Sequence, residues 1–296
     1  MKVIVTGGVG FVGTNLIKRL LKDGNEVVSL DNYSTGKKEN EQDGCKYIDV
    51  DVSDSLRRHK GFGLEKYKLE KPDLIFHLGA LARIQPSLKK PASTITNNFM
   101  GTLNVLDYAR ENNIPVVYAG SSTFHHGLWG SPYAWSKHSG EQLCKLYSTI
   151  YGLPTAICRF YNVYGEHQLE DGAYATVVGI FQKLYREEKP LTVTGDGEQR
   201  RDFTHIEDIV DALIRLGWML ESNRSSKVSG QTFELGRGKN FSINELTEMF
   251  GETDVEYIPA RDGEYDYTLA DSSKAKELLG WNPTLDISDY ISEVID

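Results

Sequence analysis

The sequence has few cysteines and lacks any long apolar run. Its three cysteines, Cys45, Cys144 and Cys158, are odd in number and lack metal-ligand spacing. We therefore expect reduced, buried thiols in a cytoplasmic protein, and no metal site. No stretch reaches the roughly 20 apolar residues that cross a bilayer, and the chain opens directly into a strand-like run. Neither a membrane span nor a signal peptide is expected.

An excess of positive charge is also missing. The chain has 33 lysines and arginines against 42 aspartates and glutamates, a formal net charge of -9. Surfaces that bind nucleic acid are basic, so we do not expect a nucleic-acid partner. This balance does not prevent a few arginines from binding phosphate locally. At 296 residues, 40% of them hydrophobic, the chain is long enough for a full core, as one large domain or a major and a minor one.

Glycine, in contrast, is concentrated near the N-terminus, where residues 2–13 read KVIVTGGVGFVG. An apolar run is followed by a turn and then by a helical pattern, and the turn contains Gly7, Gly8, Gly10 and Gly13. This order is the context that a dinucleotide fingerprint requires, because residues without Cβ let the backbone approach a pyrophosphate. The alternative is a glycine-rich turn that only connects two elements.

Asp31 supplies a second signal. It ends the strand-like run Glu26–Leu30, 18 residues after Gly13. A carboxylate at the tip of a second strand accepts hydrogen bonds from the adenosine ribose hydroxyls and repels a 2′-phosphate. The pair of signals favours a dinucleotide site over a plain turn, and NAD over NADP.

The chain alternates strand-like and helical segments. The strand-like runs are 2–6, 25–31, 45–49, 73–77, 115–120 and 153–161. This alternation predicts an α/β fold with a Rossmann-type doubly wound parallel sheet, and a loop at 32–44 near the adenosine.

The pattern changes beyond about residue 165. Helical stretches lie near 173–188, 206–222 and 242–250. We expect residues 1–165 to form an NAD-binding domain, to which some later segments return. Residues 166–296 are expected to form mainly a smaller C-terminal α/β lobe that binds substrate.

Tyr133 and Lys137 form the catalytic candidate. Ser131 and Pro132 are good residues for starting a helix, which would place the two side chains four apart on one face. A neighbouring ammonium favours the phenolate, and lowering a tyrosine pKa by roughly 3 units takes about 4 kcal/mol. The hydroxyls of 121–123, at the end of a strand-like run, can bind a substrate alcohol. The alternative is an ordinary surface pair on a helix.

Several ordered motifs together resemble a known family. They are TGGVGFVG at 6–13, HLGA at 77–80, SSTFHHG at 121–127, YAWSK at 133–137, RFYNVYG at 159–165, GDGEQRRDFTHIEDI at 195–209 and PARDGEYDYTLAD at 259–271. The chain resembles the extended short-chain dehydrogenase/reductases, and more closely their nucleotide-sugar epimerase/dehydratase group. The resemblance covers nearly the whole sequence.

The resemblance implies catalytic roles for three residues. Tyr133 would be the general base and acid, and Lys137 would hold the nicotinamide ribose and lower the tyrosine pKa. Ser122 would bind the reacting hydroxyl, with Ser121 and Thr123 as the fallback choices.

The resemblance also implies the binding residues. The expected NAD contacts are Gly7, Gly10, Phe11, Val12, Gly13, Asp31, Asn32, Ser34, Gly36, Asp51, Val52, Leu78, Gly79, Ala80, Ala82, Asn98, Tyr133, Lys137 and Tyr161. The expected substrate contacts are Ser122, Thr123, Asn162, Thr192, Thr194, Arg201, Arg261, Glu264 and Thr268. Among these, Asn162 and the two arginines would bind the diphosphate, since guanidinium is a natural bidentate partner for phosphate. A surface salt bridge is the alternative for each arginine.

Two departures from the family pattern concern the substrate. Only 11 residues separate Ser122 from Tyr133, where family members usually carry a longer loop. His125 and His126 replace the usual residues before Gly127. We expect them to fill the loop, with substrate contact as the alternative, and we expect an unusually open site.

The function that the resemblance implies is NAD-dependent epimerisation of a UDP-sugar at C4 through a 4-keto intermediate. A 4,6-dehydratase would carry Asp-Glu where Thr123-Phe124 stand, and a decarboxylase would need a glutamate within 116–132, which has none. A reductase using NADPH conflicts with Asp31. A non-catalytic NAD-binding scaffold is the alternative from another class, and the presence of the catalytic pair argues against it.

The resemblance further implies a homodimer and a feature of the sugar pocket. Two copies would pair through the helices near 99–112 and 133–151. The position seven residues after Arg261 would lie beside the C2 substituent of the sugar. That position is Thr268, which is small and would admit an N-acetyl group, whereas a shift of one residue would place Tyr267 there.

Overall fold

The computed structural model describes residues 1–54, 69–222, 227–261, 263 and 265–295. Its centre is a seven-stranded sheet in the order β11-β6-β5-β4-β1-β2-β3, and all neighbouring strands are parallel. The strands are β1 (Lys2–Thr6), β2 (Glu26–Asp31), β3 (Lys46–Asp49), β4 (Leu74–His77), β5 (Val116–Ser121), β6 (Thr155–Phe160) and β11 (Thr232–Leu235). The first six confirm the predicted strand-like runs, with boundaries shifted by one or two residues.

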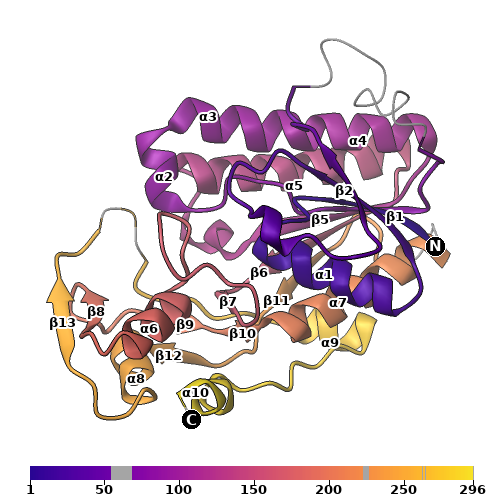
Figure 1. The fold of residues 1–296 in the computed structure, drawn as a ribbon. Helices are drawn as coiled ribbons and strands as arrows, with labels where there is room; N and C mark the ends of the chain where they lie inside the picture. The colour runs from indigo at the N-terminus through magenta and orange to yellow at the C-terminus, as the bar shows by residue number, and fades with distance from the viewer. Residues whose placement is uncertain (55–68, 223–226, 262, 264, 296) are drawn as a thin grey trace.

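Helices cover both faces of this sheet (Figure 1). One face carries α4 (Gly101–Asn112) and α5 (Pro132–Tyr151), and the other carries α1 (Phe11–Lys22), α7 (Ile206–Ser222) and α9 (Ser273–Leu279). Alternate side chains of β1 pack against the two helix layers. Val3 and Val5 belong to one core, and Ile4 belongs to the other. Strands buried on both sides are apolar throughout, as β4 is with the sequence LIFH.

Helix α5 begins as its sequence predicts. The Ser131 side chain accepts a hydrogen bond from the backbone N–H of Ala134, and Pro132 occupies the first turn. The helix ends at Gly152, whose φ of +66° is the left-handed conformation that glycine adopts readily. Its neighbours α2 (Ile84–Lys89) and α3 (Pro91–Ile95) lead through a π-helical turn, η4 (Thr96–Met100), into α4.

The C-terminal part of the chain builds a smaller lobe around a third core, which contains Phe181, Phe203 and Phe250. Its elements are β7 (Val163–Tyr164), α6 (Val177–Arg186), β8 (Leu191–Thr194), β9 (Arg200–Asp202), β10 (Thr204–His205), β12 (Asn240–Ser242), α8 (Ile243–Glu248), β13 (Val255–Ile258) and α10 (Ile287–Ile295). The short helices η1 (Lys38–Asn40) and η5 (Ser122–His126) complete the fold.

Some later segments return to the central sheet. Strand β11 pairs with β6, while α7 and α9 pack on one face. A division of the chain at residue 165 stays a prediction. Among the described residues, none of the helices combines the length and apolar character that a membrane crossing requires.

The three cysteines are free thiols, and their burial was only partly predicted. Cys144 and Cys158 are buried, whereas Cys45 is only half-buried at the start of β3. The expectation of three buried thiols is therefore wrong for Cys45, because this residue lies beside the sheet's edge strand rather than within a covered strand.

Candidate active site

A cleft of about 1120 Å³ runs along the carboxyl ends of the central strands and reaches the C-terminal lobe. In doubly wound folds this edge is where ligands bind. The cleft extends from the glycine turn after β1, past Ser121 and Tyr133, to Arg201 and Arg261 of the lobe. One continuous space therefore connects the predicted cofactor and substrate residues.

The glycine turn is a cradle that side chains would fill. A Cβ on Gly13 would lie 2.1 Å from the carbonyl oxygen of Gly7, and a Cβ on Gly36 would lie 2.6 Å from the Val9 side chain. Gly7 itself has a φ of +73°. Because the turn leads into the N-terminus of α1, its exposed amides suit a pyrophosphate. The residues present therefore fit NAD.

Asp31 is held in place at the end of β2. One carboxylate oxygen accepts from the backbone N–H of Val9 at 3.1 Å, and the other from that of Tyr33 at 2.8 Å. Burial raises the pKa of Asp31, and the backbone hydrogen bonds lower it. Asp51, at the end of the next strand, accepts from Asn32 Nδ2 at 2.9 Å. All three polar side chains line the cleft at the end predicted for the adenosine.

Tyr133 and Ser121 bring two hydroxyls together in the middle of the cleft. The Tyr133 hydroxyl donates to Ser121 Oγ at 3.4 Å, and Ser121 also accepts from the Thr123 hydroxyl at 3.0 Å. Ser121 was a fallback choice in the sequence, where Ser122 was preferred. Both serines line the cleft, and the role of Ser122 stays a prediction.

The surroundings of Tyr133 act on its acidity in opposite directions. Burial raises the pKa of Tyr133, whereas its hydrogen bond to Ser121 and the positive charge of Arg83 lower it. Arg83 was not among the predicted site residues. The available signal was a cation just after the HLGA motif, at the carboxyl end of β4.

Lys137 lies beneath the cleft, within the protein. Burial lowers its pKa to about 8, against the opposing effect of Glu141 one turn further along α5. Its ammonium lies 4.3 Å from the centre of the Tyr118 ring. Among the described groups, the cation that lowers the pKa of Tyr133 is Arg83. The predicted effect of Lys137 on Tyr133 therefore stays a prediction.

Glu141 is paired across the core. It accepts from Arg159 of β6, with Arg159 Nη2 2.7 Å from Glu141 Oε2, and both side chains are buried. Arg159 also lies near Glu234 of β11, whose carboxylate accepts from the Tyr161 hydroxyl at 2.7 Å. This network links helix α5 to strands β6 and β11.

Three predicted NAD contacts lie outside the described lining of the cleft, namely Asn98, Lys137 and Tyr161. Tyr161 turns toward Glu234, and its neighbour Phe160 lines the cleft instead. Asn98 holds the backbone after β4, since it bonds both the N–H and the carbonyl of Leu81. The predicted contact of each with NAD stays a prediction.

The substrate side of the cleft agrees with the predicted set. Asn162, Thr192, Thr194, Arg201, Arg261 and Thr268 all line it, and Glu264 lies outside the described residues. Thr268 is buried, and its hydroxyl accepts from the Asp202 N–H at 3.1 Å and from Asn162 Nδ2 at 3.2 Å. Tyr267 is 50% exposed and is not among the described residues that line the cleft, and the place of Thr268 beside the sugar stays a prediction.

The two histidines of the short loop contact other protein side chains. His125 Nε2 lies 2.5 Å from Glu234 Oε1, and the His126 ring stacks on Tyr265 with the ring centres 3.7 Å apart. Burial lowers the pKa of His126 to about 4, aided by Arg201 and His125. Such packing agrees with the interpretation that these histidines fill the loop.

Known proteins resemble this chain over its whole length. The family model for the NAD dependent epimerase/dehydratase family matches residues 3–236. A putative UDP-glucose 4-epimerase of Methanocaldococcus jannaschii is 31% identical over 99% of this chain and 97% of its own. A UDP-glucuronate 4-epimerase of Thermodesulfobacterium geofontis is 30% identical over 99% and 94%. The solved UDP-glucose 4-epimerase of Thermotoga maritima, with UDP-glucose, superposes with a TM-score of 0.89 at 26% identity, covering 100% and 97%.

The buried charge of Lys137 leads to a prediction on stability. Its pKa falls from 10.5 to about 8 in the folded protein. Keeping this lysine charged in the folded protein at pH 7 therefore lowers the free energy of unfolding by about 3 kcal/mol. This cost is present below pH 8 and disappears as pH rises to the unfolded value. Lys137→Met should therefore raise the free energy of unfolding at pH 7, and by less at about pH 9.5.

Urea unfolding at the two pH values measures this difference. Lys145→Met, which removes a partly exposed lysine from the same helix, is the control and should show no such pH-dependent gain. A Lys137→Met protein less stable than wild type at pH 7 would contradict the prediction.

Proposed function

The chain belongs to the NAD dependent epimerase/dehydratase family, and on this premise we propose that it epimerises a UDP-sugar at C4 through a 4-keto intermediate. The observation that carries the proposal is the hydroxyl pair of Tyr133 and Ser121. It lies in one cleft with the glycine cradle on one side and Arg201 on the other. A proton acceptor thus lies between a cofactor site and a phosphate-binding side chain.

The glycine cradle and Asp31 would hold NAD. When bound, the nicotinamide supplies the reversible acceptance of a hydride that oxidation and re-reduction of one carbon require. The carboxylate of Asp31 would receive the ribose hydroxyls, since both its oxygens are already turned toward this end of the cleft by backbone N–H groups. The carboxylate disfavours a 2′-phosphate at the same place.

Tyr133 would move the proton. Its oxygen would take the proton from the C4 hydroxyl of the sugar and later return it. Ser121 and Ser122 would orient that hydroxyl, and Arg83 would stabilise the phenolate, whose formation burial opposes. Arg201 and Arg261 would hold the diphosphate while the sugar presents either face of C4.

Two alternatives are less well supported by the site. A 4,6-dehydratase needs an acid and a base directly after the serine, but here the Thr123 hydroxyl bonds Ser121 and the Phe124 ring lies against Arg159, 3.4 Å from its Cζ. A non-catalytic scaffold would not require the contact between the hydroxyls of Tyr133 and Ser121.

We also propose a homodimer in the cytoplasm. Helices α4 and α5 are the expected contact, and Leu146, Ile150 and Tyr151 of α5 are exposed. An exposed apolar strip on a helix is typical of a surface that another chain covers.

Removing the hydroxyl of Tyr133 tests the proposal. Tyr133→Phe keeps the packing of the ring, so the protein should fold and bind NAD, while kcat for interconversion of 4-epimeric UDP-sugars should fall by about two to four orders of magnitude. Chromatography of the UDP-sugars measures the conversion. Tyr151→Phe, an exposed tyrosine on the same helix, is the control. Wild-type turnover in Tyr133→Phe would refute the role.

Thr268 should decide whether an N-acetyl group is admitted. Wild type is expected to accept UDP-N-acetylglucosamine, because a buried threonine leaves room beside C2. Thr268→Tyr should lower kcat/KM for that substrate far more than for UDP-glucose, and Thr268→Val, of equal size, should not. If wild type rejects the acetylated sugar while converting the plain one, this pocket assignment is wrong.

A further inference from the structure

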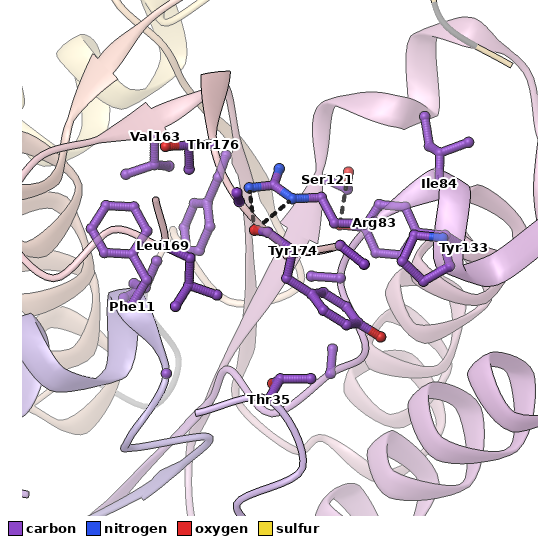
Figure 2. Close-up of a pocket in the computed structure, with 18 of the residues that line it drawn as sticks. Phe11, Thr35, Arg83, Ile84, Ser121, Tyr133, Val163, Leu169, Tyr174 and Thr176 are labelled. Carbon is purple, nitrogen blue, oxygen red and sulfur yellow. Dashed lines mark hydrogen bonds between the residues drawn. The ribbon is translucent and has the colours of Figure 1, made fainter. Parts of the chain in front are cut away.

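Arg83 places a further positive charge in the cleft. Binding of the diphosphate does not require it, because Arg201 and Arg261 are proposed for that role. Its solvent-accessible side chain starts between β4 and α2 and crosses toward the C-terminal lobe (Figure 2). There Nε and Nη2 donate to the carbonyl oxygen of Tyr174, at 3.2 and 3.1 Å. The partner is a neutral group, so the charge of the guanidinium is not compensated by it.

The electrostatic surroundings of Arg83 favour an anionic ligand. Within the described part of the chain, no carboxylate forms an ion pair with it. An arginine stays charged at neutral pH. The Tyr174 carbonyl occupies the Nε edge of the guanidinium, and the Nη1 and Nη2 edge is suited in shape to a carboxylate.

The position of Arg83 is fixed by its neighbours. Asn98 bonds both backbone groups of Leu81, at 2.8 and 3.2 Å, and the Ser87 hydroxyl donates to the carbonyl of Ile84 at 2.6 Å. The residue therefore starts from a held backbone and ends on the Tyr174 carbonyl. Such a preorganised side chain loses little freedom when it binds an anion.

The location decides which anion this is. Arg201 and Arg261 belong to the C-terminal lobe, and the glycine cradle lies at the far end of the cleft. Arg83 instead acts on Tyr133, the group proposed to work at C4 of the sugar, and Figure 2 shows it reaching Tyr174 from the side where Ser121 and Tyr133 lie. An anion bound by Arg83 would therefore belong to the sugar and not to the diphosphate.

We propose that Arg83 binds a carboxylate on the sugar and that the substrate is a UDP-uronic acid. In a uronic acid the carboxylate is C6, which is separated from C4 by C5 alone. A sugar placed with its C4 hydroxyl at Tyr133 thus brings C6 into the surroundings of the same tyrosine. This inference rests on the proposed function, because it takes Tyr133 as the group that acts at C4.

Binding to the NAD-loaded enzyme tests the inference. UDP-glucuronate and UDP-glucose differ only at C6, and calorimetry gives a Kd for each. Wild type should bind the uronate at least about tenfold more tightly, and Arg83→Gln should lose about tenfold or more of the uronate affinity with little change for UDP-glucose. Glutamine still offers an N–H to the Tyr174 carbonyl. Arg83→Lys should be intermediate, because it keeps the charge and loses the bidentate edge.

Lys89→Gln is the matched control. It removes a positive charge from another residue that lines the cleft on α2, and it should change both affinities equally. The inference is overturned if wild type does not prefer the uronate, or if Arg83→Gln weakens both sugars equally.

Failure of the uronate inference and failure of the proposed epimerisation give different results. Interconversion of 4-epimeric sugars with no Arg83-dependent preference overturns the uronate inference alone. Arg83-dependent binding of the uronate with no epimerisation of either sugar supports the inference and overturns the proposed function.

Discussion

The buried ion pair of Glu141 and Arg159 connects α5 to β6. The arrangement of the proposed active site around Tyr133 depends on this connection. Two charges taken out of water are tolerated only when each satisfies the other, and removing one leaves the other uncompensated. Here the pair is bidentate, and both side chains are buried. It fixes how α5 sits on the sheet, and therefore where Tyr133 meets Ser121 at the end of β5.

The same ion pair also interacts with the charged groups around it. Glu141 favours the protonated form of Lys137, which burial alone would disfavour more strongly. Arg159 reaches Glu234, and Glu234 in turn contacts His125 of the short loop and Tyr161. The segment around His125 is thus held by side chains that belong to the core.

The parts of the fold that local chemistry specifies could be predicted from the sequence. The strand runs, the start of α5 at Ser131 and Pro132, and the glycine cradle all depend on residues close together in the chain. Asp31 was also predictable, because the end of the second strand fixes its place relative to the cradle.

The remaining details depend on contacts between distant segments. Which serine contacts Tyr133 is decided by how α5 packs against β5, and the contact is made by Ser121, a fallback choice, while the substrate role of Ser122 stays a prediction. Tyr161 and Phe160 differ by one position, yet only Phe160 lines the described cleft, because Glu234 of β11 binds the tyrosine. The direction of the Arg83 side chain depends on its hydrogen bond to Tyr174, which lies 91 positions away in the chain.

The central claim is that this cleft oxidises and re-reduces one carbon of a nucleotide sugar. The most direct measurement follows a deuterium at C4 of UDP-glucuronate and UDP-glucose during incubation with the NAD-loaded enzyme, by NMR and mass spectrometry of the products. The account predicts a 4-epimer that keeps the deuterium at C4, with no label lost to solvent and no net change in NAD. Label released to water, or found on another carbon of the product, would contradict it.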